Sequence, residues 1–230
     1  TQNRLWVTIP NFVDTDVFRP VRAAEEKARI RGELGIPEDA FVAGTVAAVK
    51  KHHKRIDYLV NEFGHILRDL RACPEPWPKA AGSRGSARDS SASFARPFLL
   101  IAGSRQEDTE VLVAMARENA GDRARILIDL PRERMPELYR AMDVFVLASL
   151  FEMMPIAVIE ALASGLPVIA NRHPVLEWMA GGEQLSVISH QPSVGRDQLA
   201  EGGGRRAEIG GACIDMESDG ALAESLAGLT

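Results

Sequence analysis

The sequence predicts an α/β protein with a doubly wound parallel sheet flanked by helices. Residues 41–49 form a nearly continuous apolar run of small and β-branched side chains, the pattern of a strand that is covered on both faces. From there on, strand-like and helix-like segments alternate, as right-handed βαβ units require. The chain has 230 residues, of which 46% are hydrophobic and 26% charged, so the composition is that of an ordinary globular domain.

The first elements have clear local signals. Residues 5–9 read as a short strand, and a linker follows that ends at Pro20. Residues 21–34 then read as a helix. Gly35 suits the position just after a helix, and Pro37 beyond it cannot continue one, so the helix is expected to end there.

The later elements follow from the period of the apolar residues. After the buried strand at residues 41–49, residues 56–70 have apolar side chains at helical spacing. The further predicted strands are residues 98–102, 125–130, 144–148 and 167–170. The further predicted helices are residues 107–120, 135–142, 155–164, 175–179 (a single turn) and 221–229.

Two stretches interrupt this alternation. Residues 73–96 are rich in Pro, Gly, Ser, Ala and Arg, and residues 181–211 contain three consecutive glycines. The first has almost no large apolar residue, and both are expected to be mobile surface insertions. The rest of residues 21–230 is expected to form one domain.

Charge and cysteine content exclude several classes of protein. The 27 basic and 32 acidic residues give a net charge of −5, which argues against nucleic acid or anionic lipid held by bulk charge. Cys73 and Cys213 predict free thiols in a reducing, cytoplasmic setting. The most apolar stretch, residues 153–170, carries Glu160 and is broken by Pro155, so no membrane span is expected.

The loop after the strand at residues 144–148 is the most informative place for chemistry. In open parallel sheets, ligands bind beyond the carboxyl ends of the strands. Pro155 suits the first helical position, and the free amides of that first turn form an anion site worth about 0.3 to 2 kcal/mol. A phosphate is therefore expected at this helix start.

Two carboxylates flank that predicted anion site. Glu160 lies roughly 7.5 Å along the helix axis, with its side chain leaning back toward the N-terminus, while Glu152 stays in the loop. One carboxylate is placed to accept hydrogen bonds from a ribose and the other from a sugar. The neighbours of Glu160 are apolar nearly all round, and a buried carboxylate without a partner is costly, which favours a functional role.

The segment that contains both carboxylates resembles a known family signature. Residues 152–170 read EMMPIAVIEALASGLPVIA, which is similar to the Glu, seven residues, Glu motif of the family four, "group 1", retaining glycosyltransferases of GT-B fold. Three further segments agree in order, and together the matches cover nearly the whole chain outside the insertions. They are IPNFVDTDVFRP (9–20), LGIPEDAFVAGTVA (34–47) and MPELYRAMDVFVLAS (135–149).

This resemblance implies a domain plan and an activity. The family has two Rossmann-like domains, and the chain resembles the second, which binds the nucleotide sugar. Residues 1–20 would be the interdomain hinge and residues 21–230 the donor domain, with an N-terminal acceptor domain preceding Thr1. The implied reaction moves a hexose from a UDP- or GDP-sugar to an acceptor with retention, without a metal or other cofactor. This fragment would be inactive alone, and any peripheral membrane association would come through the missing domain.

The resemblance also assigns roles around the predicted anion site. Glu160 would bind the donor ribose hydroxyls, and Glu152 would contact the transferred sugar. The backbone at Met154, Pro155 and Ile156 would face the diphosphate.

The loop after the strand at residues 41–49 would supply the positive charge. Lys54 matches the lysine that neutralises the leaving diphosphate, and Asp57 matches an acidic residue that supports the turn. Ala48 stands where the family usually has an arginine, and Ala47 where a glycine is usual. The basic run at residues 50–53 is a source of compensating charge.

Two other functions stay open at this stage. The departure at Ala48 favours a nucleotide-binding or subunit-partner module without catalysis, and an epimerase of related fold is a weaker alternative. A solvated loop is the ordinary interpretation of the basic run around Lys54. Metal binding is not expected, because the adjacent His52 and His53 point apart.

Overall fold

The computed structural model describes residues 11–72, 96–179, 211–216 and 220–227. The predicted strand at residues 5–9 and nearly all of the two predicted insertions, 73–96 and 181–211, lie outside these ranges.

The sheet has six parallel strands in the order β3-β2-β1-β4-β5-β6. β1 lies in the interior and pairs with β2 on one side and β4 on the other. The predicted doubly wound parallel sheet is therefore confirmed. The strands are β1 (Ala40–Val46), β2 (Arg96–Gly103), β3 (Ala124–Ile128), β4 (Val144–Leu147), β5 (Val168–Asn171) and β6 (Gly211–Ile214).

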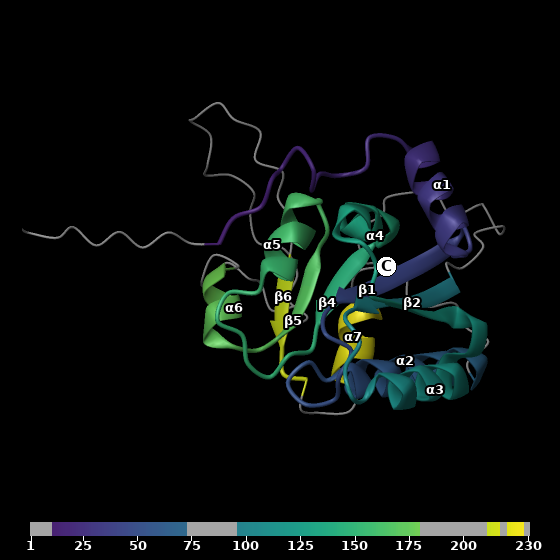
Figure 1. The fold of residues 1–230 in the computed structure, drawn as a ribbon. Coiled ribbons are helices and arrows are strands. Elements are labelled where there is room, and N and C mark those ends of the chain that lie inside the picture. The colour runs from purple at the N-terminus through teal and green to yellow at the C-terminus, as the bar shows by residue number, and fades with distance from the viewer. Residues whose placement is uncertain (1–10, 73–95, 180–210, 217–219, 228–230) are drawn as a thin grey trace, which may run out of the picture.

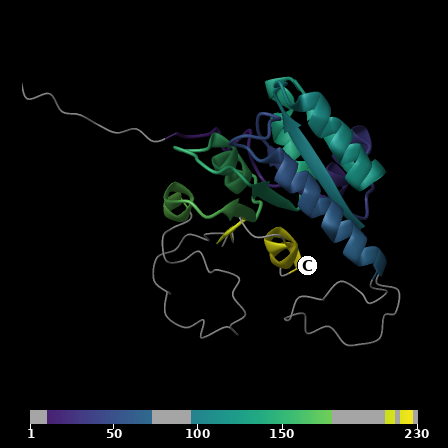
Figure 2. The same cartoon turned by 90° about the horizontal axis from the view of Figure 1, so that it is seen from below.

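Helices cover both faces of the sheet. Figure 1 shows α1, α4 and α5 on one face and α2, α3 and α7 on the other, and Figure 2 views the molecule from the side of α2, α3 and α7. The helices are α1 (Ala24–Leu34), α2 (Ile56–Ala72), α3 (Thr109–Ala120), α4 (Met135–Ala141), α5 (Ile156–Ala163), α6 (Pro174–Met179) and α7 (Ala221–Ala227). Two single 3-10 turns are η1 (Gly121–Arg123) and η2 (Arg132–Arg134).

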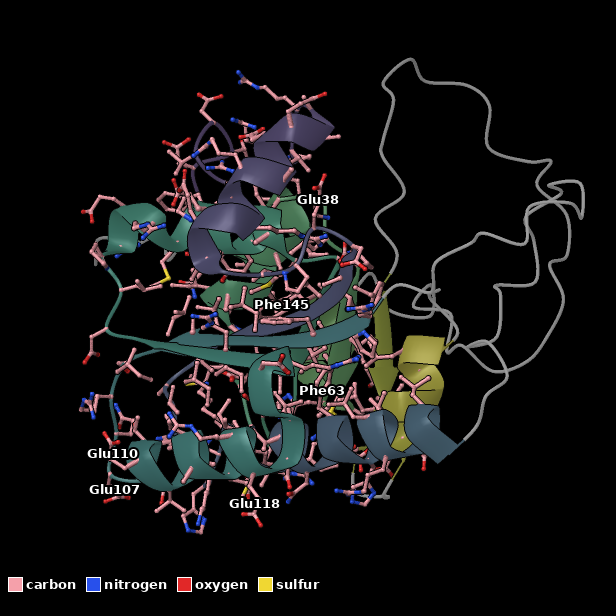
Figure 3. All side chains as sticks on the ribbon, turned by 90° about the vertical axis from the view of Figure 1, so that its right-hand side faces the viewer. Glu38, Phe63, Glu107, Glu110, Glu118 and Phe145 are labelled. Atoms are coloured by element: carbon pink, nitrogen blue, oxygen red, sulfur yellow. The ribbon has the colours of Figure 1, made fainter. Side chains whose placement is uncertain are left out.

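The core has one hydrophobic layer on each side of the sheet. One layer joins the sheet to α1, α4 and α5 and contains Phe145. The other joins it to α2, α3 and α7 and contains Phe63. Figure 3 shows these two rings on opposite sides of the sheet. All residues of β4 and β5 are buried, which explains why these strands, apart from Asn171 at the end of β5, are apolar without alternation.

The structure corrects the sequence prediction at several places. The strand predicted at residues 41–49 ends at Val46, and the helix predicted from Pro155 begins at Ile156, because Pro155 is still extended, with φ −70° and ψ 112°. The first helix begins at Ala24 and not at residue 21, because Ala23 is still extended, with φ −150° and ψ 153°. β6 was not predicted as a strand. Its four residues adjoin the glycine-rich segment, and their extended form is set by pairing with β5 rather than by a local apolar pattern.

The linker at residues 11–20 is held against the domain by charge and burial. Phe18 is only 8% exposed and joins the core. Arg19 binds Glu26 at 2.9 Å, and Arg140 from α4 approaches the same carboxylate at 3.5 Å. The hydrogen bond from Arg19, followed by one from the Arg22 backbone amide, lowers the pKa of Glu26 to about 2.

We expect Glu26→Gln to destabilise the fold at neutral pH. The lowered pKa means that the ionised carboxylate contributes stability above the unfolded value of 4.5, and that this contribution is lost as the pH falls toward 2. A loss of about 1 kcal/mol corresponds to roughly 2–4 °C in melting temperature for a chain of this size. Thermal unfolding from pH 7 to pH 2.5 measures it, with the exposed Glu33→Gln on the same helix as control. A deficit that stays constant with pH would contradict the expectation.

Candidate functional site

The sheet reverses its winding direction between β1 and β4. The chain passes from β1 to β2 and β3 on one side, and from β4 to β5 and β6 on the other. At such a switch point the two following loops lead to helices on opposite faces of the sheet, which leaves room for a ligand beyond the strand ends. The loops are in contact here, because the Leu150 amide donates to the His53 carbonyl at 2.9 Å. Each loop carries a site residue predicted from the sequence, Lys54 after β1 and Glu152 after β4.

Lys54 and Glu152 meet across these two loops. The Lys54 Nζ lies 2.5 Å from Glu152 Oε1, and the two side chains are 24% and 11% exposed. An ion pair this far removed from bulk water is less screened than a surface pair, although each ion has lost part of its hydration. The structure thus brings together the predicted cation and the predicted loop carboxylate, and each neutralises the other in the absence of ligand.

The backbone around Lys54 is in an uncommon conformation. His53 and Arg55, on either side, have φ of 72° and 50°. Left-handed conformations cost of order 1–3 kcal/mol in residues other than glycine. The turn is held by backbone hydrogen bonds from Lys54 to the His52 carbonyl and from Arg55 to the Lys51 carbonyl, both 2.8 Å. The loop that carries Lys54 therefore keeps its conformation through hydrogen bonds, and not through the intrinsic backbone preferences of its residues.

Much of that support comes from the start of α3. The Lys51 amide donates to Asp108 Oδ2 at 3.0 Å, and the Thr109 hydroxyl donates to the Val49 carbonyl at 3.2 Å. Asp57, expected to support this turn, makes no hydrogen bond to it within the described residues. No local pattern in the sequence identifies Asp108 or Thr109, because the contact between Lys51 and Asp108 joins positions 57 residues apart.

Glycine is required where the loop passes the end of β2. A Cβ on Gly103 would lie 1.7 Å from the carbonyl oxygen of Ala47, which no side chain tolerates. The Ala47 amide also donates to the Ala102 carbonyl at 2.9 Å. The loop after β1 therefore starts in direct backbone contact with β2.

Glu160 is buried on α5 and has a specific partner. It is 9% exposed, and the Tyr139 hydroxyl donates to its Oε2 at 2.6 Å. Burial raises the pKa of the Glu160 carboxyl, while the Tyr139 hydrogen bond and the positive charge of Arg132 act in the opposite direction. The predicted burial of this carboxylate is confirmed, and Tyr139 is a partner that the sequence analysis missed.

The start of α5 has no side chain that competes with an anion. Its first turn has no side-chain cap and no acidic residue. Pro155 is buried, whereas Ile156 is 43% exposed. The Met154 carbonyl accepts a hydrogen bond from the Asn11 side chain at 3.0 Å, so the linker touches the loop just before the helix. Backbone amides at this helix start suit a phosphate.

Two further contacts organise the same edge of the sheet. Asn171, at the end of β5, donates to the Ser149 carbonyl at 3.3 Å and accepts from the Met216 amide at 3.2 Å. The Phe151 ring lies edge-on to His53 and His173, with centroids 6.1 Å and 5.4 Å apart. The only signal for Asn171 in the sequence is its place directly after an apolar strand.

Within the described ranges, no three His, Cys, Asp or Glu side chains gather as a metal site would need. No helix in those ranges is long and apolar enough to cross a membrane.

The fold is that of a Rossmann-like α/β domain, and a comparison with protein families shows which family the chain belongs to. Residues 26–184 match the family described as glycosyl transferases group 1. The match covers more than half of the chain, so the chain belongs to this family of glycosyltransferases.

Individual relatives are similar over most of the chain. A D-inositol 3-phosphate glycosyltransferase of Xylanimonas cellulosilytica is 28% identical over 218 residues, which cover 87% of this chain and 44% of the relative. The chain spans less than half the length of the curated relatives that it matches.

Solved structures share the fold. Sucrose-phosphate synthase from Thermosynechococcus elongatus has a TM-score of 0.62 at 21% identity, over 95% of this chain and 41% of that one. HepE of Anabaena, solved in complex with UDP-glucose, has a TM-score of 0.53 at 16% identity, over 74% of this chain and 39% of that one. These likenesses confirm the Rossmann-like α/β fold of GT-B glycosyltransferases.

We expect Glu160→Gln to stabilise the fold at pH 7. A raised carboxyl pKa means that folding favours the protonated form, so ionisation of the group lowers stability progressively as the pH rises above the unfolded value, and the full cost is present above the folded pKa. Glutamine keeps an oxygen for the Tyr139 hydroxyl and carries no charge. The melting temperature of Glu160→Gln should exceed that of the parent protein at pH 7.

That difference should disappear below pH 4.5, the ordinary value of a glutamate, where both side chains are neutral. Glu118→Gln, on the solvent side of α3 (Figure 3), is the matched control. A lower melting temperature for Glu160→Gln at pH 7 would show instead that the ionised carboxylate stabilises the fold.

Proposed function

We propose that this chain is the donor-binding domain of a retaining glycosyltransferase that transfers a hexose from a UDP- or GDP-sugar. The observation that carries the proposal is the 2.5 Å ion pair between Lys54 and Glu152 at the switch point of the sheet. It holds a cation and a carboxylate together beside the uncapped start of α5, as a charged leaving group and a hydroxylated sugar require.

The relatives support the choice of donor. HepE shares the fold and was solved with UDP-glucose. The full-length relatives are more than twice as long as the matched region. We therefore assign acceptor binding to a second domain, N-terminal to this one, and expect the present chain to bind donor without transferring it.

The nucleotide end of the donor would lie against α5. Glu160, when ionised, accepts hydrogen bonds from the ribose hydroxyls through the oxygen that Tyr139 leaves free. The amides at Met154 and Ile156 face the diphosphate, and Pro155 keeps that turn without a competing N–H. This arrangement needs no metal, because the helix start and Lys54 supply the positive charge.

The ion pair gives Lys54 and Glu152 linked roles during transfer. When the donor binds, its diphosphate draws the Lys54 ammonium, and Glu152 turns to the sugar hydroxyls. The bond from the anomeric carbon to the diphosphate then breaks, its electron pair stays on the diphosphate oxygen, and Lys54 stabilises that charge. The acceptor oxygen forms its new bond to the anomeric carbon on the same face, and its proton passes to the departing diphosphate oxygen.

We expect calorimetry without metal to show selective binding of UDP or GDP and of their sugar conjugates. Glu160→Ala should weaken binding about 10- to 100-fold, because hydrogen bonds to a charged group contribute about 1.5–3 kcal/mol. Glu118→Ala is the control for loss of a carboxylate. Failure of the folded chain to bind either nucleotide would overturn the assignment of the donor site.

In the full-length protein, we expect Lys54→Met to lower kcat about 10²- to 10³-fold, as loss of one electrostatic stabiliser of a transition state does. Nucleotide affinity should change less, because the α5 amides and Glu160 remain. Arg117→Met, on the surface of α3, controls for loss of a cation. An unchanged kcat would remove Lys54 from the mechanism.

The second candidate is a nucleotide-binding module without catalysis. It is favoured by Ala48, which stands where the resemblance leads one to expect an arginine beside the phosphates. In that case the full-length protein binds nucleotide with the Glu160 dependence above, yet turns over no donor, and Lys54→Met changes affinity alone. Restoring an arginine with Ala48→Arg tests whether the missing side chain is the cause.

A further inference from the structure

Tyr139 sits behind the candidate site, out of reach of any ligand. Its side chain is fully buried at 0% exposure. Phe18 from the linker lies edge-on to the ring at 5.8 Å, and Phe145 from β4 packs on it at the same distance. The hydroxyl has one partner, Glu160 Oε2, at 2.6 Å. Any role of Tyr139 in ligand binding must therefore pass through Glu160.

The hydrogen bond divides the two oxygens of Glu160. Oε2 is occupied by Tyr139, whereas Oε1 has no partner in the described part of the chain. Oε1 is also not among the buried atoms that lack a partner, so it keeps some contact with solvent. The last torsion of a glutamate side chain is soft, and one fixed oxygen is what determines where the other points.

We propose that Tyr139 is a positioning residue for donor binding, which orients the Glu160 carboxylate and keeps it available as a hydrogen-bond acceptor. The inference rests on the proposed function and adds to it the residue that sets the geometry of the acceptor oxygen. Phe18 gives the linker a part in this positioning, because its ring is one of the two that pack against Tyr139.

The pH at which Glu160 becomes protonated distinguishes this role from a purely structural one, because a loss of packing alone would not change it. Two groups act on the Glu160 charge: the hydroxyl of Tyr139 from α4 and the guanidinium of Arg132 from η2, and both lower its pKa against the effect of burial. Without the hydroxyl, only Arg132 remains to favour the ionised form. The pH below which Glu160 is protonated, and nucleotide binding is lost, therefore moves upward.

The test is calorimetric titration of UDP and GDP into Tyr139→Phe from pH 5 to pH 8. At pH 7 we expect binding about 5- to 30-fold weaker than in the parent protein, the equivalent of 1–2 kcal/mol. The acid limb of the affinity profile should shift to higher pH, so that the deficit grows as the pH falls. Tyr58→Phe, which removes the hydroxyl of the only other tyrosine in the sequence, is the control.

A second measurement needs no ligand. Carbon-13 NMR of labelled glutamate carboxyls, with Glu160→Gln to assign the signal, follows the titration of Glu160 directly. Tyr139→Phe should raise its midpoint and Tyr58→Phe should not. Phe18→Leu, which keeps the hydroxyl but loosens the ring, should produce a smaller shift in the same direction and serves if Tyr139→Phe folds poorly.

The outcomes separate the two proposals. Affinity and pH profile unchanged in folded Tyr139→Phe, with Glu160 titrating as in the parent protein, would overturn the role of Tyr139. Absence of nucleotide binding in the parent protein would overturn the proposed function instead. The NMR titration would then decide by itself whether Tyr139 sets the state of Glu160.

Discussion

The reversal of strand order between β1 and β4 is the constraint on which the candidate site depends. Parallel strands place all their following loops at one edge, and at this reversal the loop after β1 lies beside the loop after β4, although the helices that follow, α2 and α5, pack on opposite faces of the sheet. Lys54 and Glu152 are about 98 residues apart in sequence and meet because of it. The contact across the two loops also accounts for the left-handed backbone of His53 and Arg55 and for the hydrogen bond to Asp108. A loop that reaches toward the neighbouring loop has a backbone conformation that its own residues do not favour, so other elements must hold it.

The two acidic residues of the site are balanced in different ways. Glu152 faces an ammonium group that can move to another anion, so its partner is exchangeable. Glu160 faces a phenolic hydroxyl and a more distant guanidinium, so its partner is fixed and its negative charge is only partly offset. A substrate that carries both a diphosphate and hydroxyl groups fits this contrast: the diphosphate competes for the mobile cation, and the hydroxyls find an acceptor whose position does not change.

The sequence predicts the parts of this structure that depend on local pattern. Apolar runs gave the buried strands, helical spacing gave α2, and Gly35, at φ 67°, ends α1 as a glycine in that position should. The apolar surroundings of Glu160 indicated a buried carboxylate. Tyr139, Asp108 and β6 were missed for one physical reason. Each acquires its role from a partner that is distant in sequence, and none differs locally from an ordinary core tyrosine, surface aspartate or loop.

The linker at residues 11–20 contacts the residues that build the candidate site. Its Asn11 donates to the Met154 carbonyl before α5, and its Phe18 packs on the tyrosine that holds Glu160. The ion pairs of Arg19 and Arg140 with Glu26 hold the end of the linker against α1 and α4. A change in the path of this linker therefore alters the backbone beside the anion site and the support of the buried carboxylate together. Conversely, a ligand that fixes Glu160 and the start of α5 also favours one path of the linker, because the same contacts join them.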